Sequence, residues 1–127
     1  MENEALAWVN MAKQDLAVAK HLNAKFLPKP LEIICYHCQQ AAEKAVKALI
    51  IKTGCQGGMP KNHDISFLLG QIRNMIDVPD EYYDYADTLT PYGVAVRYPN
   101  ELFLEERHVR DAIIYADKML FWAESLV

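Results

Sequence analysis

The sequence predicts an all-α protein, an antiparallel up-and-down bundle of four main helices with a shorter fifth. Apolar residues recur every three or four positions over five successive segments, and proline or glycine lies between these segments. No segment shows the alternation of apolar and polar residues that is typical of a half-buried strand. A chain of 127 residues is long enough for one core of this kind. We therefore expect a single domain over residues 1–127.

The first two segments are the longest. Over residues 4–26 the apolar positions form one stripe, and the charged side chains lie largely opposite. Pro28 and Pro30 end this helix and begin the second, which is expected from about residue 31 to residue 53. Gly54 makes further helix costly. The short link predicts that these two helices pack against each other as antiparallel neighbours.

Three further segments complete the bundle. The third helix is expected to place an apolar face over residues 65–76, after a polar loop. A fourth begins near residue 80, and Pro91 and Gly93 are expected to break or kink it. The last covers residues 104–126. All five helices are thus separated by short connections, as a bundle requires.

Composition excludes several classes of protein. A formal net charge of −4 argues against a broad basic surface that grips nucleic acid, so any anion site must be local. No stretch is long and apolar enough for a membrane span or a secretory signal. Three cysteines, an odd number, are typical of reduced thiols. We expect a cytoplasmic protein with no membrane association.

The second expected helix carries two different faces. Its apolar stripe consists of Ile34, Cys38, Ala41, Ala45, Ala48 and Leu49, and the adjacent polar row consists of His37, Gln40, Lys44 and Lys47. Small alanines let a neighbouring helix approach closely, and the polar row offers ammonium groups, an amide and an imidazole to an anion. The row is therefore a candidate nucleotide or anion site.

Two other interpretations of the polar row stay open. In the first interpretation, the lysines of this row belong to a solvated helix face on which Glu43 and Lys47 form an ion pair. The second interpretation makes the row an interface, because Tyr36 lies on the same side and an exposed aromatic ring among polar groups suits a second subunit.

Two positions outside this helix complete the candidate site. Pro99 restricts Tyr98 to extended geometry, which fixes where Arg97 leaves its helix and suits recognition of phosphate. Alternatively, Arg97 satisfies the last carbonyls of its own helix or pairs with a nearby carboxylate. His63 precedes the third helix beside Asp64. In a functional interpretation, this pair binds an anion or takes part in proton transfer. In the alternative interpretation, it simply caps the helix. Asn62 is the other candidate cap.

Metal sites are not favoured. Cys35 and Cys38 form a C-x-x-C that Cys55 and His63 would complete, but Cys38 falls on the apolar stripe, so buried thiols are the better interpretation. One Glu-x-x-His, at Glu105 and His108, is too few for a di-iron bundle. We expect no metal, no cofactor other than a nucleotide ligand, and no catalytic residue.

Taken together, these motifs resemble the HEPN domain family over nearly the whole chain. The matching segments are the Trp8 region with Asp15-Leu16-Ala17-Val18-Ala19, residues 36–49, His63-Asp64-Ile65 and Ala95-Val96-Arg97-Tyr98-Pro99. The resemblance implies a helical bundle that commonly forms a homodimer. It also implies association with a small nucleotidyltransferase protein encoded beside it, in arrangements that include toxin–antitoxin pairs.

One branch of that family consists of RNases with an arginine followed, after four to six residues, by a histidine. None of Arg73, Arg97, Arg107 and Arg110 has a histidine at that distance. The resemblance therefore implies the non-nuclease branch, a module that binds a nucleotide or phosphate-bearing ligand through Lys44, Lys47, Arg97, His63, His37 and Gln40. The alternatives are a HEPN-type RNase toxin that uses His37 or His63 as general base, and a purely structural dimeric scaffold.

Overall fold

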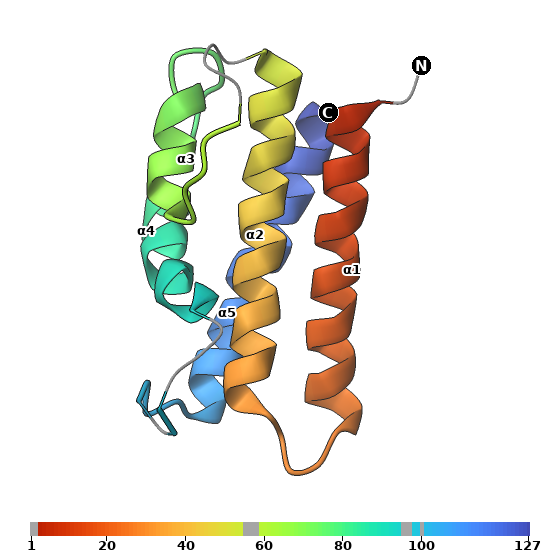
Figure 1. Cartoon of the computed structure of the whole chain (residues 1–127), viewed down its shortest axis with the longest axis vertical. Coiled ribbons are helices and arrows are strands. Elements are labelled where there is room, and N and C mark those ends of the chain that lie inside the picture. Colours follow the sequence, from red (N-terminus) through yellow and green to blue (C-terminus); the bar gives the residue numbers. More distant parts are fainter. Residues whose placement is uncertain (1–2, 55–58, 95–97, 100) are drawn as a thin grey trace.

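The structure is a computed structural model that describes residues 3–54, 59–94, 98–99 and 101–127. Its elements are α1 (Glu4–Lys25), α2 (Leu31–Thr53), α3 (Ile65–Ile72), α4 (Asp80–Leu89), the short 3-10 helix η1 (Thr90–Gly93) and α5 (Glu106–Leu126). Three long rods, α1, α2 and α5, stand side by side, and the short helices α3 and α4 lie along one side of them (Figure 1). The all-α bundle predicted from the sequence is confirmed.

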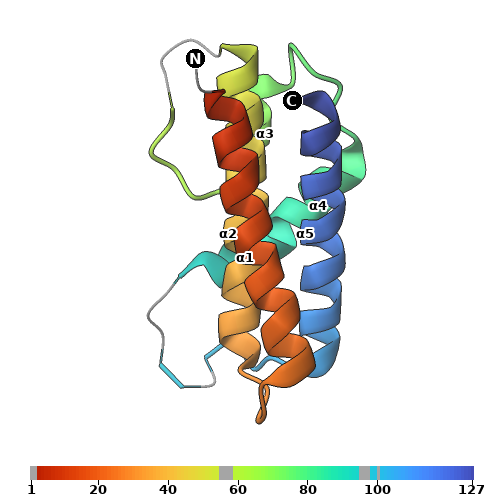
Figure 2. The ribbon, with the colours of Figure 1, turned by 90° about the vertical axis from the view of Figure 1, so that its right-hand side faces the viewer.

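The two long N-terminal helices have the predicted bounds. The side chain of Asn3 accepts a hydrogen bond from the backbone N–H of Leu6, 3.1 Å away, and so caps α1. Gly54 ends α2 with φ of 65°, a left-handed conformation that suits glycine. The two helices run in opposite directions, and the start of α1 lies at the same end of the bundle as the end of α5 (Figure 2).

The second helix is the centre of the core. It packs against α1, α3, α4, α5 and η1. The stripe expected to be apolar is fully buried, from Ile34 to Leu49. Three alanines on it, Ala41, Ala45 and Ala48, let the neighbouring helices approach closely. Because α2 is covered on almost every side, only a narrow row of its side chains reaches the surface.

The short helices differ from the expected bounds. The third ends at Ile72 rather than residue 76, because the Ile72 carbonyl accepts from the backbone N–H of both Met75 and Ile76 and the chain turns there. The fourth stops at Leu89, and the expected break takes the form of η1. The last helix begins at Glu106, two residues later than expected.

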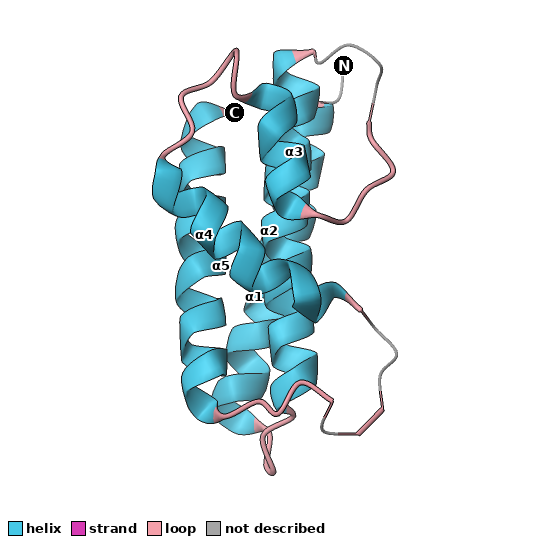
Figure 3. Cartoon of the chain, turned by 90° about the vertical axis from the view of Figure 1, so that its left-hand side faces the viewer, coloured by secondary structure: helices cyan, strands magenta, loops and turns pink. Residues whose placement is uncertain are grey.

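Hydrogen bonds join the short helices where they lie on the same side of the bundle (Figure 3). The backbone N–H of Ile65 donates to the hydroxyl of Thr90, 3.1 Å away, and so links the start of α3 to the start of η1. The hydroxyl of Ser66 in α3 donates to the carboxylate of Asp87 in α4, 2.6 Å away. None of the described helices has the length and apolar character needed to cross a bilayer.

Candidate functional site

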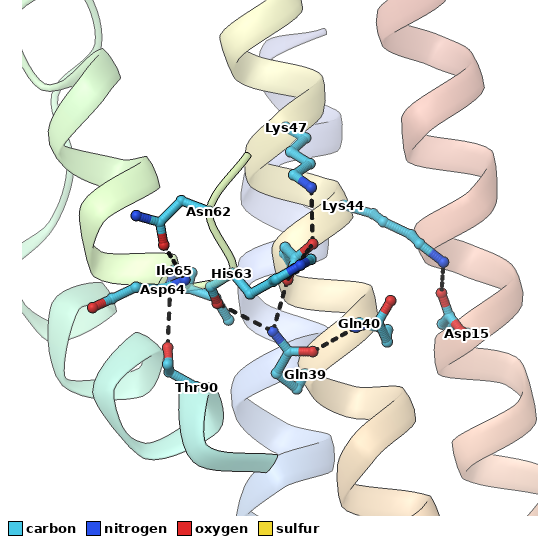
Figure 4. Close-up of polar contacts among 11 residues, drawn as sticks. Asp15, Gln39, Gln40, Lys44, Lys47, Asn62, His63, Asp64, Ile65 and Thr90 are labelled. Atoms are coloured by element: carbon cyan, nitrogen blue, oxygen red, sulfur yellow. Dashed lines mark hydrogen bonds and ion pairs between the residues drawn. The ribbon is translucent and has the colours of Figure 1, made fainter. Parts of the chain in front are cut away.

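The middle of α2 buries a carboxylate among hydrogen-bond donors. Glu43 is only 3% exposed. Its carboxylate accepts from the Gln39 amide at 2.9 Å and from the Lys47 ammonium at 2.9 Å. Nδ1 of His63, from the loop before α3, lies 3.0 Å from the same carboxylate (Figure 4). We call these four residues the Glu43 cluster.

The donors decide the charge of Glu43. Burial acts to raise its pKa, but the hydrogen bonds from Lys47, Gln39 and His63 outweigh burial, and the pKa is lowered from its ordinary value. The carboxylate is therefore ionised at neutral pH. Lys47 lies under the Trp8 ring, with Nζ 5.6 Å from the ring centroid, so its ammonium is enclosed by a carboxylate and an aromatic face.

Gln39 holds the cluster together. Besides Glu43, its amide reaches the backbone carbonyl of His63 at 3.5 Å, and its own oxygen accepts from the Gln40 amide at 2.8 Å. The backbone of Gly93 passes directly beside this amide. A Cβ at Gly93 would lie 2.7 Å from Cδ of Gln39, so a side chain larger than hydrogen does not fit. The break after α4 thus brings a glycine to the polar face of α2.

A second carboxylate, on α1, gathers two side chains of the same polar row. Asp15 accepts from the Lys44 ammonium at 2.6 Å, and its other oxygen lies 2.9 Å from Nδ1 of His37. All three side chains are partly buried, and each is less than 30% exposed. We call Asp15 of α1 and His37, Gln40 and Lys44 of α2 the polar strip.

The structure divides the predicted site residues. His37, Gln40 and Lys44 lie on the polar strip, and His63 stands beside it with a side chain that is 78% exposed. Lys47 forms the predicted pair with Glu43, but the expectation that this pair is solvated is wrong, because Lys47 is only 9% exposed. Arg97 lies outside the described residues.

Gln39 and Asp15 were missed as site residues, and Glu43 was predicted only as the ion-pair partner of Lys47. Gln39, Glu43 and Lys47 stand four residues apart, and this spacing was visible, yet it does not reveal that the row is buried. Asp15 was named only in a segment that resembles the family. Its partners are 22 and 29 residues away in the chain, so only the packing of α1 on α2 brings them together.

The structure shows which residues cap the third helix and where two of the cysteines lie. Asp64 caps α3 by accepting from the backbone N–H of Phe67, and Asn62 in turn accepts from the backbone N–H of Asp64. The thiols of Cys35 and Cys38 are buried, as interpreted, and burial raises the pKa of Cys35 to about 12.

The Glu-x-x-His motif serves the backbone at the start of α5. Its histidine, His108, accepts from the backbone N–H of Glu105 at 2.9 Å, which is a helix-capping contact. Within the described ranges no three His, Cys, Asp or Glu side chains are grouped so that they would hold a metal ion.

Comparison with known proteins gives the family. The HEPN domain model matches residues 5–126. TT1696 from Thermus thermophilus is 25% identical, with a TM-score of 0.82 over 99% of this chain and 100% of that one. ST0689, an archaeal HEPN homologue, is also 25% identical, with a TM-score of 0.72 over 99% of this chain and 98% of that one.

An HEPN domain protein from Thermotoga maritima is 28% identical, with a TM-score of 0.74 over 94% of this chain and 96% of that one. Among curated proteins the comparison found no match. The family model spans the whole bundle, from the start of α1 to the end of α5, and therefore includes both carboxylates and their donors. The chain belongs to the HEPN domain family.

Proposed function

We propose that this chain is a HEPN module that binds a nucleotide or another phosphate-bearing ligand on its polar strip and acts with a small nucleotidyltransferase partner. One observation carries the ligand part of the proposal. Lys44 and His37 are both held on one acceptor, Asp15, at the surface of α2. A phosphate that takes the place of this carboxylate meets an ammonium and an imidazole that are already ordered, so little side-chain entropy is lost on binding.

The other candidate residues have different parts in this proposal. Gln40 offers an amide between His37 and Lys44 on the same row. Lys47 is enclosed by Glu43 and Trp8, so it makes no direct contact with the ligand. His63 borders the strip with an exposed ring, and the sequence prediction adds Arg97 as a guanidinium donor. The direct contact with the greatest weight is Lys44.

Two opposite substitutions test the ligand part. Lys44→Ala is expected to weaken ATP or GTP binding roughly ten-fold in isothermal titration, because one charge-assisted hydrogen bond is lost. Asp15→Asn is expected to strengthen binding by roughly the same factor, because it removes a carboxylate that competes with phosphate for Lys44. Lys52→Ala, at an exposed lysine on the same helix, is the matched control and should change nothing.

The pattern of the two variants separates a ligand site from a structural ion pair. If the pair only joins α1 to α2, both substitutions lower the melting temperature and neither changes nucleotide binding. Binding should also weaken as salt rises, since the contacts are between charges. An affinity that stays the same in Lys44→Ala and Asp15→Asn would remove the polar strip from the proposal.

The family resemblance supports the partner part, together with an exposed groove between α1 and α5. Leu16 and Leu120 form its floor, and Phe121 on its edge is 76% exposed. An apolar ring in this position suits contact with another protein. Light scattering on the wild type and Phe121→Ser should show a homodimer that the substitution weakens. Co-purification with a co-expressed small nucleotidyltransferase tests the second partner.

Phe121 is on α5, whereas the polar strip is formed by side chains of α1 and α2, so the two parts of the proposal can fail independently. A Phe121→Ser protein that keeps its mass and still co-purifies with the nucleotidyltransferase would show that the groove serves neither contact. A monomeric Phe121→Ser protein that binds nucleotide normally would leave the ligand part intact.

A further inference from the structure

A pocket of about 300 Å³ opens at the N-terminal half of α2, next to the polar strip. The rings of Tyr36, His37 and Tyr92 line it, together with aliphatic side chains that include Ile33. Burial raises the pKa of Tyr92 to about 12, so this ring stays uncharged. Aromatic and aliphatic walls with few polar groups are typical of a pocket that takes a flat ring, and this volume is at the small end for ligand pockets.

The pocket and the polar strip share one residue. The His37 ring lines the pocket, while its Nδ1 lies 2.9 Å from Asp15. The second oxygen of that carboxylate holds the ammonium of Lys44 at 2.6 Å. The carboxyl group of Asp15 therefore lies between His37, on the pocket wall, and Lys44, the strongest candidate for a phosphate contact. A ligand with a flat ring and a phosphate chain can occupy both places at once.

The carboxylate of Glu32 also lines the pocket. Glu32 makes no hydrogen bond or ion pair with any residue in the part of the chain that the structure describes. An ionised carboxylate presents two parallel acceptors, which match two adjacent N–H donors on a planar group. Among the common nucleobases, guanine has such an edge, in its ring N1–H and its 2-amino group. Adenine and cytosine place a ring acceptor beside their amino group, and this acceptor would face the carboxylate.

We propose that this pocket takes the guanine ring of a guanine nucleotide, with Glu32 on the N1–H and 2-amino edge and the phosphates directed to His37 and Lys44. This inference rests on the proposed function, because it names the nucleotide that the polar strip binds. The aromatic walls contribute stacking to the ring, and Glu32 contributes the selectivity for guanine.

Isothermal titration of the full chain with four probes tests the proposal: GTP, ATP, inosine triphosphate and inorganic tripolyphosphate. GTP is expected to bind at least ten-fold more tightly than ATP, and more tightly than inosine triphosphate, which lacks the 2-amino group. If GTP and ATP bind alike, or if tripolyphosphate binds as tightly as GTP, the base pocket is refuted while the phosphate site stands. If no probe binds, the proposed function fails and this inference fails with it.

Two variants locate the effect in the pocket. Glu32→Gln, which keeps the size but offers a single acceptor, should bring the ratio of GTP to ATP affinity close to one, because GTP loses an acceptor and ATP no longer faces a carboxylate. Ile33→Trp, at a side chain that is 53% exposed, should fill the pocket and weaken GTP but not tripolyphosphate. Ile114→Trp, the same change at an exposed isoleucine of α5, is the control. An unchanged ratio in Glu32→Gln would refute the role of the carboxylate.

Discussion

A methyl group added at Gly93 is expected to destabilise the whole polar core of α2. In Gly93→Ala the new Cβ would lie 2.7 Å from Cδ and 2.9 Å from both terminal atoms of Gln39, whereas ordinary contact begins at 3.4 Å. The Gln39 amide must therefore retreat by about 0.7 Å, the difference between these two distances. Retreat is costly because this amide is fully buried and bonded to Glu43, Gln40 and the His63 carbonyl.

The expected loss of stability in Gly93→Ala follows from the two ways in which the close contact with Gln39 can be relieved. Either the amide breaks a buried hydrogen bond, or η1 shifts away from α2, and each costs about 1–3 kcal/mol. For a domain of this length the loss corresponds to a fall in melting temperature of roughly 3–5 °C for each kcal/mol. The backbone of Gly93 does not have a positive φ, so alanine has no conformational penalty there, and the loss arises from the contact with Gln39.

Gly70→Ala is the matched control, since nothing lies within 4 Å of a Cβ at this glycine of α3. It should stabilise the protein by about 0.4–1 kcal/mol, because alanine favours a helix more than glycine. Urea unfolding followed by circular dichroism measures both variants on one scale. A Gly93→Ala protein as stable as the wild type would show that Gln39 moves freely, and it would refute the packing described for the Glu43 cluster.

Two further predictions concern protonation of buried groups. Glu43→Gln should lower the free energy of unfolding at neutral pH by about 3 kcal/mol, because it leaves Lys47 buried without a counter-charge; Glu81→Gln, at an exposed carboxylate of α4, is its control. The pKa of Glu43 is lower in the folded protein than its ordinary value of 4.5, so its contribution is present above pH 4.5 and is lost as pH falls through the lowered pKa. In urea titrations, wild type and Glu43→Gln should therefore converge in acid, and a constant difference would contradict this assignment. In a Cys55→Ser protein, Cys35 and Cys38 should resist a thiol reagent at pH 8 until urea unfolds the chain, since burial raises both pKa values; fast labelling of the folded protein would contradict their burial.

The long helices were predictable because the signals that set them are local. Pro30 and Gly54 bound α2, and its apolar spacing predicts the buried stripe without reference to any neighbour. The end of α3 was not predictable in this way. Ile76 continues the apolar period past Ile72, but the chain turns there to reach α4, and a pattern of apolar residues does not distinguish a last helical turn from a tight turn that also packs on the core.

The candidate site was only half predictable, because helical period gives the face of a residue and not its neighbour. The sequence places His37, Gln40 and Lys44 in one row, and in the structure His37 and Lys44 share the Asp15 carboxylate. That Lys47 is buried depends on Trp8 from α1 and on the loop that carries His63. Likewise, Asp15 becomes the shared partner of His37 and Lys44 through the register of α1 against α2, which no segment of the sequence specifies alone.

The two carboxylates are not equally free to exchange partners for a ligand. Glu43 is bonded to Gln39, which packs on Gly93 and on the loop before α3, so a ligand that displaced Glu43 would disrupt the contacts that hold α2 to η1. Asp15 holds only side chains that reach the surface, and α1 keeps its apolar contacts with α2 when that carboxylate loses a partner. A phosphate can therefore take Lys44 and His37 from Asp15 at little cost in stability, while Lys47 stays bound to Glu43. For this reason we place the proposed ligand on the polar strip and not on the Glu43 cluster, although the cluster has as many hydrogen-bond donors as the strip.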